Sequence, residues 1–163
     1  MSTAYADVRQ AGRELALAVM CHLESYPPAE HGTAVALLLA SPPSGDADGE
    51  DVIARFARDP ATRAFAESLV GECLGRLPEI DALIEATSRT WRLSRMDRVD
   101  RNVVRMATAE LLLRAEVPRA AILSEAVRLA GRYGSDRSTS FVNGLVEDLA
   151  KRLRPGPEPG ASA

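Results

Sequence analysis

The chain has 163 residues, a formal net charge of −3 and a composition that is 46% hydrophobic but only 4% aromatic. This length fits a single domain with a core large enough to need no disulfide or metal. The weak negative charge excludes a protein that is basic on every face, whereas a local basic patch is compatible with it.

Cysteine usage and the N-terminus indicate a cytoplasmic protein. Cys21 and Cys73 lie far apart among apolar neighbours and form no CxxC motif, so they suit a reduced compartment. No basic run precedes an apolar stretch at the N-terminus, which argues against a signal peptide. The longest strongly apolar run, 34–40, is too short to span a bilayer, so we expect no membrane association.

The first half of the chain predicts helices separated by prolines and one polar loop. Apolar residues recur at three- and four-residue steps before Pro27–Pro28, and Asp59–Pro60 marks a helix start. Pro78 is either a kink or a fresh start. The expected helices cover about 4–25, 29–40, 50–58 and, interrupted near Pro78, 60–87.

The second half predicts three further helices and a tail. Ser94 and Asp97 are spaced as a capping box, and Gly134 suits a helix end. A close helix crossing would explain Gly144 inside a helical pattern. The expected helices cover about 95–115, 118–133 and 138–153, and the Pro- and Gly-rich segment 154–163 is expected to be disordered.

No segment shows the period-two alternation of a strand. The fold class is therefore predicted to be all-α, a compact bundle of about seven helices. We expect one helical domain over 1–153, followed by the disordered tail 154–163.

The segment from Trp91 to Gly144 carries an ordered set of short motifs. They are WRLSRMDRVDR, EL, VP, EA and FVNG, which begin at Trp91, Glu110, Val117, Glu125 and Phe141. In this order they resemble the C-terminal half of the NusB family. The same residues have structural interpretations, and Phe141 and Val142 are expected to pin the last helix to the core.

The resemblance implies a NusB-like fold and a function in transcription antitermination. It implies that the protein pairs with NusE, a small-subunit ribosomal protein, on boxA-type leader RNA. The pair would join an antitermination complex on RNA polymerase and promote processive ribosomal RNA transcription. No cofactor is implied.

The resemblance also implies RNA contacts from the N-terminal helix, where family members carry an arginine-rich beginning. Here that helix offers Arg9, Gln10 and Arg13, with acidic residues on both sides. We further expect RNA contacts from the loop Ser135, Asp136 and Arg137, because exposed amides at the start of the last helix favour an anion. Fewer arginines weaken phosphate binding. The alternative is therefore a paralogue that binds a protein partner, or itself, with little specific RNA binding.

Arginines recur at short intervals over 89–105, where six of them outnumber two aspartates. A basic ridge of this kind is a candidate phosphate footprint, and Trp91 within it could stack on a base. The other interpretation is a solvated face with internal ion pairs, in which Trp91 is a core anchor.

Family geometry places a protein partner on the helix after Arg95, so Arg98 and Arg101 are candidate contacts. Some family members self-associate, and Met20 and Cys21 are candidates for such a face. Arg105 and Glu110 are expected to be structural.

The chain contains no recognisable catalytic motif. His22 and His31 are isolated, and no metal-ligand pattern, P-loop or Gly-rich nucleotide turn is present. We therefore expect a binding protein rather than an enzyme. NusB-like domains also occur fused to RNA cytosine methyltransferases, but such a protein needs a further cofactor-binding α/β domain, which this sequence does not contain.

Overall fold

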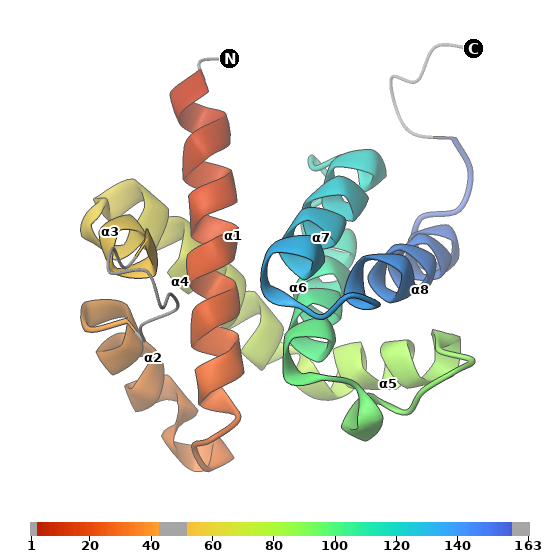
Figure 1. Ribbon diagram of the computed structural model, residues 1–163, viewed down its shortest axis with the longest axis horizontal. Helices are drawn as coiled ribbons and strands as arrows, with labels where there is room; N and C mark the ends of the chain where they lie inside the picture. Colours follow the sequence, from red (N-terminus) through yellow and green to blue (C-terminus); the bar gives the residue numbers. More distant parts are fainter. Residues whose placement is uncertain (1–2, 43–51, 158–163) are drawn as a thin grey trace. The chain divides into compact units, whose positions relative to one another are not determined.

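The computed structural model describes residues 3–42 and 52–157. Over these residues the chain forms eight α-helices, two short 3₁₀ helices and no β-strand, which confirms the predicted all-α fold (Figure 1). The chain divides into two compact units, residues 1–71 and 72–163, which are described separately. The prediction of one domain over 1–153 stays a prediction.

The first unit contains three whole helices and most of a fourth. In chain order its elements are α1 (Thr3–Leu23), the 3₁₀ helix η1 (Pro28–Glu30), α2 (His31–Ala40), α3 (Val52–Arg58) and α4 (Pro60–Gly75). Helix α1 packs against α2 and α3, and Leu15 and Val19 on α1 are fully buried. Asp59 caps α4 as predicted, because its carboxylate accepts hydrogen bonds from the Thr62 amide at 2.9 Å and hydroxyl at 2.7 Å. These bonds hold the pKa of Asp59 below its usual value.

The second unit begins with the end of α4. Its other elements are α5 (Leu77–Thr87), the 3₁₀ helix η2 (Leu93–Arg95), α6 (Arg98–Leu113), α7 (Arg119–Tyr133) and α8 (Ser138–Leu153). Pro78 therefore lies in the first turn of a new helix rather than at a kink. Helix α6 packs against α5, α7 and α8, and ten of its residues are buried, which makes it the centre of this unit.

Two sequence-based details of this unit are wrong. Ser94 lies in η2, and α6 begins only at Arg98, where the N-cap residue Asp97 makes no side-chain capping hydrogen bond. The predicted capping box is therefore absent. Gly144 is exposed on α8, and a Cβ atom there would meet nothing within 4 Å, so no close helix crossing explains it.

The predicted tail also needs a correction at its first residue. Arg154 follows α8 directly, and its side chain donates hydrogen bonds to four backbone carbonyls of the second unit. Residues 158–163 lie outside the described residues. Disorder beyond residue 157 stays a prediction.

The cysteines are free thiols in different environments. Cys73, near the end of α4, is fully buried, and this burial raises its pKa to about 12. Cys21 on α1 is half-buried. In the described parts of the chain, no helix is long and apolar enough to cross a bilayer.

Candidate nucleic-acid interface

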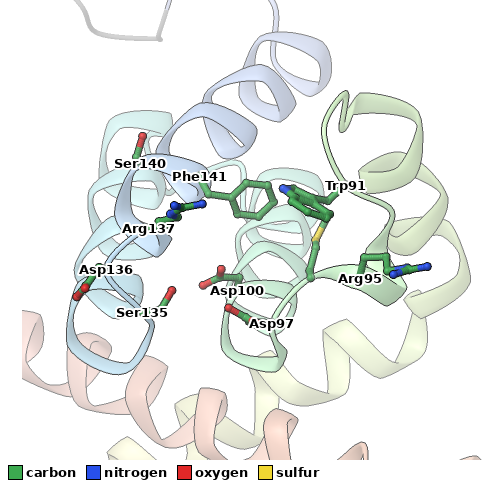
Figure 2. Close-up of a pocket in the computed structure, with 10 residues that line it drawn as sticks. Trp91, Arg95, Asp97, Asp100, Ser135, Asp136, Arg137, Ser140 and Phe141 are labelled. Atoms are coloured by element: carbon green, nitrogen blue, oxygen red, sulfur yellow. The ribbon is translucent and has the colours of Figure 1, made fainter.

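A pocket of about 550 Å³ opens in the second unit where the starts of α6 and α8 meet the loop between α5 and α6 (Figure 2). Its lining includes the whole predicted RNA loop. The lining residues are Trp91, Arg95, Met96, Asp97, Asp100, Ser135, Asp136, Arg137, Ser140 and Phe141.

Trp91 presents a large aromatic surface at this pocket. It is 52% exposed, so it is not a core anchor. The Ser88 hydroxyl holds its backbone, because this oxygen donates to the Trp91 carbonyl at 2.6 Å and accepts from the Trp91 amide at 3.4 Å. Phe141 on α8 also borders the pocket and is half-buried, whereas Val142 is fully buried and pins α8 to the core as predicted.

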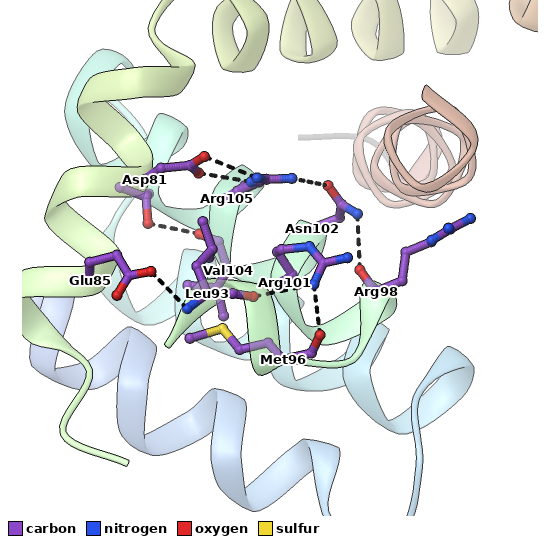
Figure 3. A network of polar contacts seen from close by, with 10 residues as sticks. Asp81, Glu85, Leu93, Met96, Arg98, Arg101, Asn102, Val104 and Arg105 are labelled. Atoms are coloured by element: carbon purple, nitrogen blue, oxygen red, sulfur yellow. Dashed lines mark hydrogen bonds and ion pairs between the residues drawn. The ribbon is translucent and has the colours of Figure 1, made fainter. Parts of the chain in front are cut away.

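The loop that carries Trp91 is fixed on both sides (Figure 3). The Leu93 amide donates to the Glu85 carboxylate at 2.9 Å. The Arg101 guanidinium donates to the carbonyls of Leu93 at 3.2 Å and Met96 at 2.7 Å. An exposed ring on a fixed loop is ready to stack against a planar ligand with little loss of conformational freedom.

Asp100 lies at the inner wall of the pocket and is only 6% exposed. It accepts a hydrogen bond from the Ser138 side chain, but its Oδ1 atom has no hydrogen-bond partner among the described residues. Burial raises the pKa of Asp100, and Asp97 adds to the rise, while the hydrogen bond from Ser138 opposes it. A buried carboxylate oxygen without a donor is costly, and because Oδ1 is shielded from solvent, a ligand would have to displace part of the pocket wall to reach it.

Gly134 allows the loop before α8 to close on this carboxylate. The Ser135 amide donates to Ser138 Oγ at 2.9 Å, and Ser138 in turn bonds to Asp100. A Cβ atom at Gly134 would collide with Ser138 Oγ and lie 2.6 Å from the Ala130 carbonyl oxygen. Gly134 ends α7 as predicted, but its φ of −92° shows that space, not a left-handed backbone, requires glycine.

The arginine run over 89–105 divides into two parts. Arg105 donates to both Asp81 carboxylate oxygens, at 2.8 and 3.0 Å, and ties α6 to α5, while Arg101 holds the η2 loop (Figure 3). These two arginines have structural roles. The other four, Arg89, Arg92, Arg95 and Arg98, are exposed.

The predicted RNA residues of α1 belong to the first unit. Arg13 is only 4% exposed, and its guanidinium carbon lies 5.5 Å from the centre of the Phe65 ring. This burial gives Arg13 a packing role in the free chain, and an RNA contact from it stays a prediction. Arg9 is half-buried and Gln10 is exposed, so an RNA contact from these two stays a prediction.

The predicted partner residues are distributed over both units. Met20 is 3% exposed, so Cys21 retains more surface of this pair. Arg98 is exposed, whereas Arg101 is half-buried and bonded to the η2 loop. Partner contacts from these four residues stay predictions.

Comparison with models of known protein families is consistent with the helical fold. The NusB family model matches residues 12–151. The chain belongs to the NusB family. A relative from Sorangium cellulosum, named transcription antitermination protein NusB, is 44% identical over 89% of this chain and 93% of its own length. A relative of the same name from Myxococcus xanthus is 39% identical over 89% of this chain and 96% of its own length.

Solved structures agree with the fold of this NusB-family chain. NusB of T. maritima superposes with a TM-score of 0.66 at 28% identity and covers 88% of this chain and 90% of its own. A chain from a complex of antitermination factors NusB and NusE with double-stranded RNA gives a TM-score of 0.68 at 20% identity, covering 90% and 98%. At that identity the second likeness supports the fold alone.

Sequence reasoning missed the hydrogen bond between Ser138 and Asp100 at this candidate site. A signal was present, because Asp100 lies on the same helical stripe as Val103, Val104 and Ala107, all of which are buried. A charged residue on an apolar stripe is a candidate buried carboxylate.

Proposed function

We propose that this protein is an RNA-binding transcription antitermination factor that pairs with NusE on boxA-type leader RNA. Within an antitermination complex on RNA polymerase, the pair would promote processive ribosomal RNA transcription in the cytoplasm. Family membership supports this function, since relatives named transcription antitermination protein NusB align over more than nine-tenths of their length. The action would be binding, with no bond made or broken by the protein.

The observation that carries the RNA-binding proposal is the pairing of an exposed ring with a buried, unpaired carboxylate oxygen. Trp91 offers a face on which a base can stack, which contributes about 1–3 kcal/mol per base. Asp100 Oδ1 is shielded from solvent in the free protein, so it would accept a hydrogen bond from an amino or imino group of that base once the wall of the pocket around it opens. Together these groups would select an unpaired nucleotide rather than a base inside a duplex.

The charges at the pocket support recognition of a base more than of a phosphate. The lining contains two arginines, Arg95 and Arg137, and three aspartates. Phosphates would instead be neutralised at the rim, by these arginines and by Arg89 and Arg92, all four of which are exposed. Ser135 and Asp136 would contribute polar contacts at the same rim.

The remaining contacts are proposals that rest on the family. Arg9 and Gln10 would extend the RNA contact along α1. Arg98 would meet NusE, with Arg101 acting mainly through the η2 loop. Cys21 and Met20 would lie near a face used when two copies associate.

Fluorescence titration of boxA-type RNA and of a scrambled RNA, repeated over a salt series with and without NusE, tests the function. We expect tighter binding to boxA-type RNA, strengthened by NusE. Trp91→Ala should weaken boxA binding by about tenfold through lost stacking, with an almost unchanged melting temperature. Tyr26→Ala, which removes another exposed aromatic residue outside the pocket, is the matched control and should bind like the wild type.

The burial of Arg13 favours the alternative, a NusB-family paralogue without specific RNA binding. With Arg13 buried, α1 has one cation fewer to offer to RNA phosphates. Equal, weak binding to both RNAs, unaffected by Trp91→Ala, would support that paralogue and contradict the proposal.

A further inference from the structure

The side chain of Arg154 closes the C-terminal end of α6. Its guanidinium donates to the carbonyls of Glu110 at 2.9 Å, Leu111 at 2.9 Å, Arg114 at 2.8 Å and Val117 at 2.6 Å. The last carbonyls of a helix lack partners within the helix, and a cation there also complements the helix dipole. A residue about forty positions away in sequence thus supplies the cap.

Arg119, in the first turn of α7, holds the backbone of the same segment. Its guanidinium donates to the carbonyl of Arg154 and, at 2.6 Å, to that of Gly156. We call Arg119, Arg154 and the carbonyls that they bond the C-terminal clasp. The clasp joins the end of α8 to the end of α6 and to the start of α7 by hydrogen bonds from charged donors, which are stronger than neutral ones.

The candidate RNA pocket lies at the other ends of the same two helices. Asp100 is in the first turn of α6, and Ser138, which bonds to it, is the first residue of α8. Helices α6 and α8 pack against each other between these points. The pair is therefore fixed by directional bonds at both ends, Asp100–Ser138 at the start and the clasp at the finish.

Close packing of apolar side chains holds α8 against α6 along its length, and the directional bonds at the two ends add to the definition of its register. Helix α8 transmits a shift along its axis from one end to the other, since a helix is stiff and rises about 1.5 Å per residue. A slide of α8 at the clasp would carry Ser138 away from Asp100 and would open the Ser135 turn that borders the pocket.

We propose that Arg154 is a positioning residue for RNA binding, which fixes the register of α8 on α6 and so holds Ser135 and Ser138 against Asp100. It touches no RNA. This inference rests on the proposed function for its effect on RNA, but the coupling between the two ends is a property of the protein alone.

Hydrogen exchange of single amides tests the coupling in the full-length protein without RNA. The reporter is the Ser135 amide, which donates to Ser138 Oγ. The internal reference is the Leu93 amide, which lies in η2 rather than on α8 and donates to Glu85 on α5. Well below the melting temperature of the least stable variant, Arg154→Ala should speed Ser135 exchange severalfold and leave Leu93 exchange unchanged.

RNA titration over a salt series gives the second readout. We expect Arg154→Ala to raise the dissociation constant for boxA-type RNA by about tenfold, with an unchanged salt slope, because no phosphate contact is lost. Arg154→Lys should restore only part of the affinity, since an ammonium group cannot span four carbonyls. The matched control is Lys151→Ala, which removes a neighbouring exposed cation whose ion pair with Glu147 lies within α8 and should leave both readouts unchanged.

The outcomes separate the two proposals. A lower melting temperature with unchanged Ser135 exchange and unchanged affinity would overturn the coupling and leave Arg154 as a helix cap alone. A salt slope reduced by about one would overturn it in favour of a direct phosphate contact. If the wild type bound no RNA, the proposed function would fail, while Ser135 exchange would still decide the coupling.

Discussion

Two segments predicted to contact RNA differ sharply in the structure. On α1, Arg13 is buried over Phe65, whereas the loop Ser135–Arg137 borders an open pocket with Asp100 and Trp91. A basic residue placed on a helix by sequence can thus be buried, while a polar loop before a helix can line an open pocket. Burial gives Arg13 a packing role, whereas RNA binding by the loop is a proposal, and each can be tested.

The largest effect should come from Gly134→Ala, which tests how tightly the loop beside the pocket is packed. The new Cβ would press on the Ala130 carbonyl oxygen, a backbone atom that cannot move away, and on Ser138 Oγ. We expect a loss of about 3 kcal/mol in the free energy of unfolding, measured by urea denaturation. Gly75→Ala is the control, because a Cβ there meets nothing within 4 Å. Equal stability of the two variants would mean that the loop relaxes freely.

Arg13→Ala tests whether Arg13 on α1 has a packing role. It removes a buried cation–π contact and the packing of the arginine stem, so we expect a loss of about 1–2 kcal/mol in unfolding free energy. Arg58→Ala, which removes an exposed arginine of the same unit, should change stability by less than about 0.5 kcal/mol. If Arg13→Ala left stability intact and weakened RNA binding instead, the original assignment of Arg13 to RNA would be restored.

Asp100→Asn tests the buried carboxylate of the pocket through the pH dependence of the free energy of unfolding. The pKa of Asp100 is raised on folding, so the folded state binds more protons than the unfolded state as pH rises above the unperturbed value of 3.8. Wild-type stability should fall over that window relative to the Asn variant, and the difference should level off once Asp100 is ionised. Urea denaturation at a series of pH values measures it.

Asp59→Asn provides a control of opposite sign for the pH series. The pKa of Asp59 is lowered on folding by its bonds to Thr62, so its contribution is present above pH 3.8 and is lost as pH falls through the lowered pKa. Parallel pH curves for the two variants would show that Asp100 is not held in a buried site.

The smallest expected effect is a gain. Gly144→Ala should stabilise the protein by about 0.5–1 kcal/mol, because the glycine is exposed within α8 and an added Cβ meets no atom. A thermal melt measures the change. Unchanged or lower stability would contradict the open surroundings of this position.

The sequence alone predicted most of the helices, because their boundaries follow local signals. Helix α8 begins at Ser138 and ends at Leu153, as expected from Gly134 and the Pro-rich segment, and Asp59 caps α4. The start of α6 was missed by three residues, because Arg101 draws the carbonyls of Leu93 and Met96 into a separate turn. That interaction depends on tertiary geometry.

The candidate site was predicted only in part for the same reason. The loop Ser135–Arg137 was found from its place before a helix, but the pairing of Ser138 with Asp100 joins residues on different helices. The clasp at Arg154 was missed because a Pro- and Gly-rich composition suggests disorder, whereas four carbonyl acceptors hold this residue.

The environment of Cys73 has a practical consequence for these measurements. A fully buried thiol with a pKa raised to about 12 carries almost no thiolate at neutral pH, and the thiolate is the reactive form. Maleimide reagents should therefore modify the native protein at Cys21 alone. One dye could then be attached to α1 without mutating either cysteine, and alkylation of Cys73 would report the fraction of unfolded molecules.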